Sequence, residues 1–225
     1  MTNYGVCVAR VRGLCAGVWR RGGGCGARRP YGTGGWGLAE AQEKKKNNNV
    51  FVAMDTLGLL RIRVRRGYNL IVRDKIASSS DPYVVITTTQ QKVKTNVVKK
   101  NCNPEWCDEV SLSIKDLNDS IELTVYDKDT LGADDPMGTA EIDLKPYLEA
   151  ARLRKELQEL PNGCALKKVQ PSGTNDLADE SRILWENGRI TQDMRLKLRN
   201  VESGEVLIQI EWVDIPGCKG LDPDF

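Results

Sequence analysis

Six aspartates stand in two places where strand-like patterns stop, two in the first place and four in the second: Asp74, Asp81, Asp127, Asp129, Asp134 and Asp135. Calcium takes about six to eight oxygen ligands at flexible distances, which carboxylates on two neighbouring loops can supply with main-chain oxygens and water. A single aspartate in a turn needs no such explanation, because its side chain bonds the nearby backbone. Close carboxylates, however, repel one another by roughly 1 kcal/mol per pair even in water. A divalent cation would remove that penalty, so the clusters predict a calcium site.

The absence of histidine limits the enzymatic alternatives. The chain has no histidine, which excludes Ser-His-Asp and Cys-His catalysis and every histidine-containing zinc site. An enzymatic alternative to calcium binding is hydrolysis by two metal ions held on the aspartates. No phosphate-binding loop or activated nucleophile accompanies these acids, however. Lys and Arg number 33 against 31 Asp and Glu, so the net charge of +2 gives no reason to expect nucleic-acid binding. A binding module without catalysis of its own is favoured.

Short strands must position these acids. Residues 59–65 alternate apolar and arginine side chains, which is the period of a half-buried strand. Similar runs, separated by Gly, Pro, Asn and Asp clusters, follow at 83–89, 92–98, 109–114, 121–126, 139–144, 194–198 and 206–213. About eight short strands predict an all-β sandwich.

One segment has helical rather than strand spacing. Within residues 146–160, Leu153, Leu157 and Leu160 recur at helical intervals among charged side chains, which predicts one amphipathic helix. The polar stretch that follows, residues 161–192, is longer than an ordinary connection. Such a length indicates a functional or mobile segment.

The first 53 residues differ in composition from the rest. They are rich in glycine and carry six arginines before the first acid, Glu40, which is typical of a disordered tail. A transit peptide and an extended translation start, with Met54 as the first residue of the working domain, are both open interpretations. The folded domain is expected over residues 54–221.

The cysteines and the apolar runs indicate where the protein works. Seven cysteines without a C-x-x-C pair are unlike a disulfide framework and favour a reducing, cytosolic compartment. No apolar run approaches the ~20 residues that a membrane-spanning helix needs. Any membrane contact is therefore expected to be peripheral.

Four lysines, in and just after one predicted strand, are candidates for binding anionic phospholipid: Lys92, Lys94, Lys99 and Lys100. Alternate residues of a strand share a face, and each basic group near an anionic membrane contributes about 1 kcal/mol of attraction. The alternative is an ordinary solvated edge strand, on which lysines prevent edge-to-edge aggregation.

Three motifs make the chain resemble the C2 domain. Residues 80–83 read Ser-Asp-Pro-Tyr, residues 103–106 read Asn-Pro-Glu-Trp, and residues 126–129 read Tyr-Asp-Lys-Asp, with an Asp and a Gly following at fixed intervals. The resemblance runs from about residue 57 to residue 221. It implies that main-chain oxygens of Arg73 and Lys128 bind Ca²⁺ together with five carboxylates: Asp74, Asp81, Asp127, Asp129 and Asp135. Asp134 is a weaker candidate.

Further segments resemble the small plant C2-domain abscisic-acid-related family, which includes GTPase-activating C2 proteins. They are residues 58–70, the helix start at 145–147, residues 177–181 and the ending at 212–220. The resemblance implies an eight-stranded antiparallel C2 β-sandwich of type II strand order. A short helix would lie in a family-type insertion over residues 145–192.

The family resemblance also implies a function. It is that of a calcium-dependent adaptor, bound peripherally to anionic phospholipid membranes, that recruits abscisic acid receptors to the plasma membrane from the cytoplasm or the nucleus. Stimulation of a GTPase is implied as well. The alternative is a GTPase-activating or protein-interaction module whose lipid binding does not depend on calcium.

Overall fold

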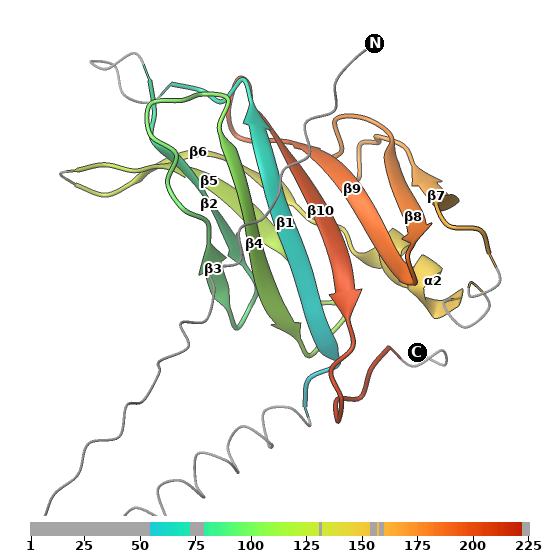
Figure 1. Ribbon diagram of the computed structural model, residues 1–225. Helices are drawn as coiled ribbons and strands as arrows, with labels where there is room; N and C mark the ends of the chain where they lie inside the picture. The colour runs from blue at the N-terminus through green and yellow to red at the C-terminus, as the bar shows by residue number, and fades with distance from the viewer. Residues whose placement is uncertain (1–54, 73–78, 131, 154–156, 158–159, 222–225) are drawn as a thin grey trace, which may run out of the picture. The chain divides into compact units, whose positions relative to one another are not determined.

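Two antiparallel sheets make up the computed structural model, which describes residues 55–72, 79–130, 132–153, 157 and 160–221 (Figure 1). The six-stranded sheet has the order β4 (Glu105–Ile114), β1 (Gly58–Tyr68), β10 (Glu205–Val213), β9 (Arg189–Lys197), β8 (Ser181–Glu186) and β7 (Cys164–Val169). The four-stranded sheet has the order β3 (Lys92–Lys94), β2 (Pro82–Thr87), β5 (Glu122–Asp127) and β6 (Asp135–Glu141). The last strand lies between β1 and β9, which is the type II order expected. The antiparallel sandwich is confirmed.

Strand β1 supplies much of the core because its side chains alternate between the two faces of the sheet. Leu60, Ile62 and Val64 are fully buried between the sheets. On the outer face, Arg61 and Arg63 lie within 3.5 and 3.0 Å of the Glu211 carboxylate on the paired strand β10. The alternation that the sequence predicts for this strand is therefore confirmed.

Two strands, β7 and β8, lie in the segment for which a long connection was expected, so the described residues form ten strands and not eight. Strand β8 buries Ile183 and Trp185. Strand β7 is an edge strand that buries no side chain fully. Because its exposed positions carry Lys167 and Lys168, its sequence lacks the apolar alternation by which strands are recognised.

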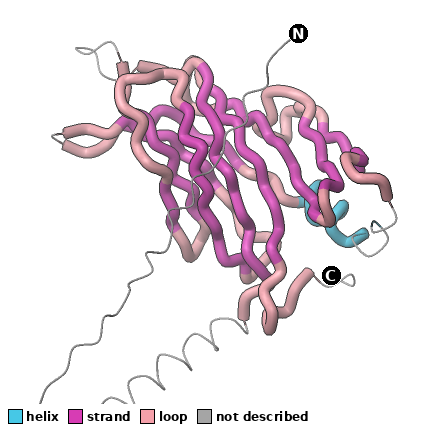
Figure 2. The backbone as a smooth tube through the Cα atoms, in the orientation of Figure 1, coloured by secondary structure: helices cyan, strands magenta, loops and turns pink. Residues whose placement is uncertain are grey.

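The two added strands extend the larger sheet beyond the smaller one. Strand β3 packs next to β4 and strand β6 next to β9, so β7 and β8 project past the edge of the four-stranded sheet. Helix α2 (Lys145–Arg152) contacts β7 and β9 and covers this projection (Figures 1 and 2). Helix α2 therefore packs against the part of the six-stranded sheet that the four-stranded sheet does not cover.

Helix α2 is shorter than expected and buries different residues. It ends at Arg152, and its buried side chains are Tyr147, Leu148, Ala150 and Ala151. Of the three leucines behind the prediction, only Leu157 is buried, whereas Leu153 and Leu160 are exposed. The prediction that these three leucines form the buried face of the helix was therefore wrong. The buried side of the helix is fixed instead by the Tyr147 hydroxyl, which donates a hydrogen bond to Ile190 O at 2.8 Å and accepts one from Trp212 N at 2.7 Å.

The tail expected over residues 1–53 lies outside the described residues. None of the helices in the described part of the chain is long and apolar enough to cross a membrane. Within the described residues, Cys102, Cys107, Cys164 and Cys218 are free thiols.

Candidate metal centre

The register of the four-stranded sheet brings three of the expected acids to one end. Asp127, the last residue of β5, pairs with Pro82 at the start of β2 and with Asp135 at the start of β6. Asp81 directly precedes Pro82. Because neighbouring strands are about 4.8 Å apart, these carboxylates belong to adjacent strand ends. Strands β2, β5 and β6 can be followed in Figure 1.

Backbone N–H groups hold two of these carboxylates in place. Asp127 is 4% exposed, and its Oδ1 accepts a hydrogen bond from Asp81 N at 2.6 Å. Asp81 Oδ1 in turn accepts one from Lys100 N at 2.8 Å. A further bond joins Lys128 N to Asp81 O at 3.0 Å. The two loops that carry the acids are therefore tied to each other directly.

Asp134 is held by protein groups on several sides. Its carboxylate accepts hydrogen bonds from Lys128 Nζ at 2.8 Å, from the Tyr83 hydroxyl at 2.6 Å and from Asp129 N at 3.1 Å. The bonds from Lys128 and Tyr83 lower the pKa of Asp134 to about 2. Burial, and then the bond to Asp134, raises the pKa of Tyr83 to about 12. Asp134 therefore orders the β5–β6 loop, a role that competes with binding a cation.

The remaining expected ligands are less completely described. Asp129 is half-buried beside Asp134, and Asp135 is exposed at the start of β6, a strand that begins four residues before its predicted start. Arg73 and Asp74 lie outside the described residues. Among the residues that the structure does describe, no three His, Cys, Asp or Glu side chains are grouped closely enough to hold a metal ion.

The donor chemistry at this end of the sheet fits calcium. Asp81, Asp127 and Asp135 offer only oxygen atoms, the ligand type that Ca²⁺ takes. Asp127 and Asp81 are already oriented by backbone N–H donors, so little rearrangement of these two is needed. The described residues therefore supply part of an oxygen donor set, to which the expected Asp74 would add.

Trp106 is a positioning residue that the sequence analysis did not assign. Its side chain is 7% exposed, and its indole Nε1 donates a hydrogen bond to Pro82 O at 3.0 Å. Pro82 is the residue that pairs with Asp127 and follows Asp81. The Asn-Pro-Glu-Trp motif contained the signal, but the tryptophan's partner lies 24 residues away in the chain.

The four candidate lysines divide into two pairs. Lys92 and Lys94 are exposed on edge strand β3, with Val93 half-buried between them. Lys99 and Lys100 are exposed in the turn before β4, because β3 ends at Lys94 and not at the predicted residue 98. Within the described ranges, none of the four forms an ion pair with an acid: Lys92, Lys94, Lys99 and Lys100.

Comparison with known proteins agrees with the C2 motifs of the sequence. The C2 domain family model matches residues 58–160. Protein C2-DOMAIN ABA-RELATED 10 of Arabidopsis thaliana is 56% identical over 165 residues, which cover 73% of this chain and 91% of that protein. This chain belongs to the C2-domain ABA-related family. C2-DOMAIN ABA-RELATED 8 of the same plant is 56% identical over 161 residues, covering 72% of this chain and 95% of the relative.

Among solved structures, a C2 domain of plant Extended Synaptotagmin 1 shares 21% sequence identity, with a TM-score of 0.47, and the match covers 71% of this chain and 97% of that one. Membership of the C2-domain ABA-related family, together with the C2 domain itself, supports a calcium- and lipid-binding signalling module.

Proposed function

We propose that this protein is a calcium-dependent phospholipid-binding adaptor, carried by residues 54–221, that recruits abscisic acid receptors to the plasma membrane. The observation behind the proposal is the pairing of Asp127 with both Pro82 and Asp135, which gathers acids at one end of the smaller sheet. Calcium bound there would neutralise these acids and offer open coordination positions to phosphate oxygens of lipid. The protein would be a peripheral membrane protein exchanging with the cytoplasm and the nucleus.

The residues of the chain have separate tasks in this proposal. Asp81 and Asp127 hold the cation, with Asp74, Asp129, Asp135 and the main-chain oxygens of Arg73 and Lys128 completing its ligands. Trp106 and Lys100 fix the position of Asp81 through their hydrogen bonds. The exposed lysines on and after β3 add attraction for anionic head groups, about 1 kcal/mol each.

Sedimentation of the full chain with phosphatidylserine/phosphatidylcholine vesicles, in calcium and in chelator, tests the calcium dependence. The double variant Asp127→Asn with Asp135→Asn should bind no better in calcium than in chelator. Asp119→Asn is the matched control. Asp119 lies between β4 and β5, at the opposite end of the sheet from Asp127, and it should keep the full calcium response. A calcium response that survives in the double variant would contradict the proposed site.

Lipid binding independent of calcium in the unaltered protein would favour the alternative, in which the lysines alone contact the membrane. Lys92→Gln with Lys94→Gln should weaken binding to phosphatidylserine vesicles by about tenfold or more, since two basic groups contribute ~2 kcal/mol. Lys115→Gln, on the connection after β4, is the control for charge alone.

The partner-specific parts of the proposal have their own tests. A purified abscisic acid receptor should appear with the vesicles only when this protein and calcium are both present. GTP turnover by a candidate GTPase should rise when the protein is added, and equal rates with and without it would remove GTPase stimulation from the proposal.

A further inference from the structure

Gln192 is a buried amide with one atom unsatisfied. It is 1% exposed on strand β9, where Gln192, Met194 and Leu196 alternate on the face that points away from solvent. Its Nε2 donates a hydrogen bond to Ser181 Oγ at 2.8 Å. Its Oε1 has no hydrogen-bond partner. Leaving a buried acceptor without a hydrogen-bond donor is unfavourable, so a group that donates a hydrogen bond to Gln192 Oε1 would be stabilised there.

The neighbouring hydroxyl fixes which end of the amide is unsatisfied. Ser181 Oγ donates its single proton to Asp193 O at 2.7 Å, so it can only accept a bond from Gln192. The amide must therefore turn its NH₂ group toward Ser181, and the unpartnered atom is necessarily the oxygen. A ligand for this position must be a hydrogen-bond donor.

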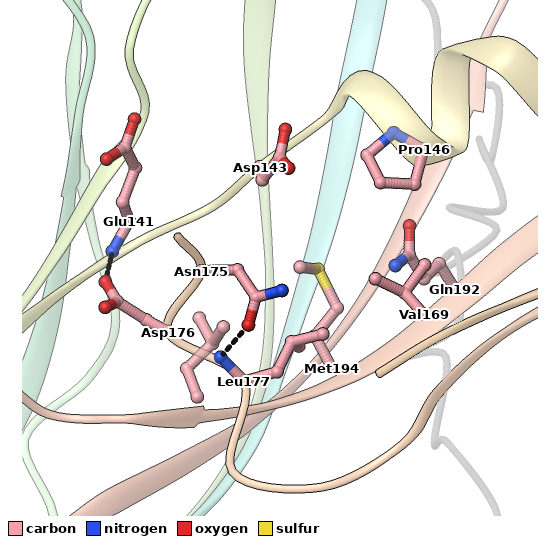
Figure 3. A pocket seen from close by; sticks show the side chains of 10 residues that line it. Glu141, Asp143, Pro146, Val169, Asn175, Asp176, Leu177, Gln192 and Met194 are labelled. Carbon is pink, nitrogen blue, oxygen red and sulfur yellow. Dashed lines mark hydrogen bonds between the residues drawn. The ribbon is translucent and has the colours of Figure 1, made fainter. Parts of the chain in front are cut away.

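Gln192 forms part of the wall of a pocket between the β6–α2 connection and the segment that carries β7 and β8 (Figure 3). Val169, Leu177, Met194 and Leu196 make its apolar side. The pocket measures about 250 Å³ including its open mouth, but its enclosed part has space for only about one water-sized group. A planar guanidinium is too large for the enclosed part, whereas an ammonium is not.

The polar side of the pocket is acidic. Glu141, Asp143 and Asp176 line it, and no lining residue is basic. The Glu141 carboxylate, however, points away from the pocket (Figure 3) and accepts a hydrogen bond from Ser120 Oγ at 3.4 Å. Asp176 is already engaged, because its Oδ2 accepts a bond from Glu141 N at 2.6 Å and lies 3.1 Å from Arg199 Nε. Asp143 Oδ1 accepts one bond, from Lys145 N at 3.0 Å. Asp143 is therefore the lining acid whose charge favours a cationic donor over a neutral one.

We propose that this pocket binds a primary ammonium group on an apolar stem, with the unpaired Gln192 oxygen as its buried acceptor and the Asp143 carboxylate as its counter-charge. An ammonium has three donors and no acceptor, and its stem would lie against Leu177 and Met194. A free amine and a lysine side chain of a second protein both carry such a group. The site lies apart from the acids at the strand ends and works without calcium.

Methyl NMR of the full chain, labelled at the methionine methyl groups, tests the site directly. The chain has four methionines; Met194 lines the pocket, and fully buried Met137 does not. Titration with n-butylammonium should shift the Met194 signal and leave Met137 unchanged, while n-butanol and n-butylguanidinium should bind at least about tenfold more weakly. The proposal would be overturned if n-butylammonium did not shift the Met194 signal, or if all three compounds shifted it equally. The pocket would then hold only water.

Two peptides separate the two sources of the ammonium. If a lysine side chain is the ligand, an unmodified lysine peptide should shift the Met194 signal and its acetyl-lysine counterpart should not. If only the free amine shifts the signal, the ligand is a small molecule. Either result supports an ammonium site.

Two glutamine-to-methionine variants test the role of the unpaired Gln192 oxygen. Gln192→Met keeps the side-chain volume but removes the acceptor, so it should weaken n-butylammonium binding at least about tenfold while the urea midpoint stays equal or rises. Gln209→Met is the control, because both ends of Gln209 are paired, with Arg63 and Asp193, and it does not line this pocket. It should lower the urea midpoint and leave ammonium binding intact. Equal ammonium affinity of Gln192→Met and the unaltered protein would refute the site, whatever the outcome for calcium and lipid.

Discussion

Lys100 donates its backbone N–H to the Asp81 carboxylate at 2.8 Å, so a residue of the basic turn also orients a candidate calcium ligand. Lys100 adopts a positive φ of 53°, a conformation that side-chain-bearing residues rarely take. The side chain and the backbone of this lysine therefore have separable tasks. The ammonium faces solvent, and the N–H holds Asp81.

Glycine substitution separates the two tasks. Lys100→Gly keeps the N–H and removes the strain of the positive φ, so the free energy of unfolding should change by less than ~0.5 kcal/mol. Lys99→Gly, at the neighbouring exposed lysine, should lose about 0.5–1 kcal/mol because glycine adds backbone freedom to the unfolded chain without a compensating relief. Both variants should bind phosphatidylserine vesicles about fivefold more weakly, since each loses one basic group. Urea unfolding and vesicle sedimentation measure the two effects.

The Asp134 carboxyl should make stability depend on pH in acid. Its pKa of about 2 in the folded protein lies below the ordinary value of 3.8. The ionised form is therefore favoured by folding, and its contribution is present above about pH 4 and lost as the pH falls toward 2. Asp134→Asn should remove this part of the pH dependence. Urea unfolding between about pH 2 and pH 5 measures the free energy of unfolding at each pH. If this free energy depends on pH in the same way in Asp134→Asn and in the unaltered protein, the carboxyl is not linked to folding.

Gly58 should not tolerate a side chain. A Cβ there would come within 2.5 Å of Cζ2 of the Trp212 ring. Gly58→Ala should therefore destabilise the fold by about 1–3 kcal/mol through overpacking. Gly173→Ala is the control, because a Cβ at Gly173 would meet no atom within 4 Å. Thermal unfolding of both variants checks the difference, and equal midpoints would mean that the Trp212 ring can move aside.

The Tyr147 hydroxyl should stabilise the whole projecting part of the larger sheet. Tyr147→Phe leaves Ile190 O without its donor and Trp212 N without its acceptor in a buried position. The expected loss is about 1–3 kcal/mol in the free energy of unfolding. Hydrogen exchange should show faster opening around β9 and α2 than in the unaltered protein, and unchanged exchange there would argue against this role.

Strands that bury one face against the opposite sheet and turn the other face outward were predictable from sequence, because one-sided burial imposes alternation of apolar and polar residues. Residues 59–65 and 206–213 show this pattern, and β1 and β10 pair along it. Strand β7 was not predictable in this way, because it lies at an edge of the sheet and buries no side chain fully, so its sequence does not alternate. The end of α2 was also misplaced, because its buried face consists of Tyr147, Leu148 and two alanines, while Leu153 and Leu160 beyond its end are exposed.

At the candidate site, the sequence located the acids but not the groups that hold them. Asp81, Asp127 and Asp135 were recognisable from motif spacing. The bonds from Trp106 Nε1 and Lys100 N join residues 24 and 19 positions apart in the chain, and no local pattern reports such contacts. The unpaired oxygen of Gln192 was equally hidden, since a glutamine in a strand gives no sign of whether its amide is satisfied.

The projection of β7 and β8 beyond the smaller sheet has an evolutionary consequence. These strands are hydrogen-bonded only at the outer edge of β9, and their cover is a single helix. Substitutions there leave the pairing of β2, β5 and β6 untouched. Sequence divergence in the projecting part is therefore compatible with an unchanged set of acidic strand ends, so the two parts of the fold can evolve independently.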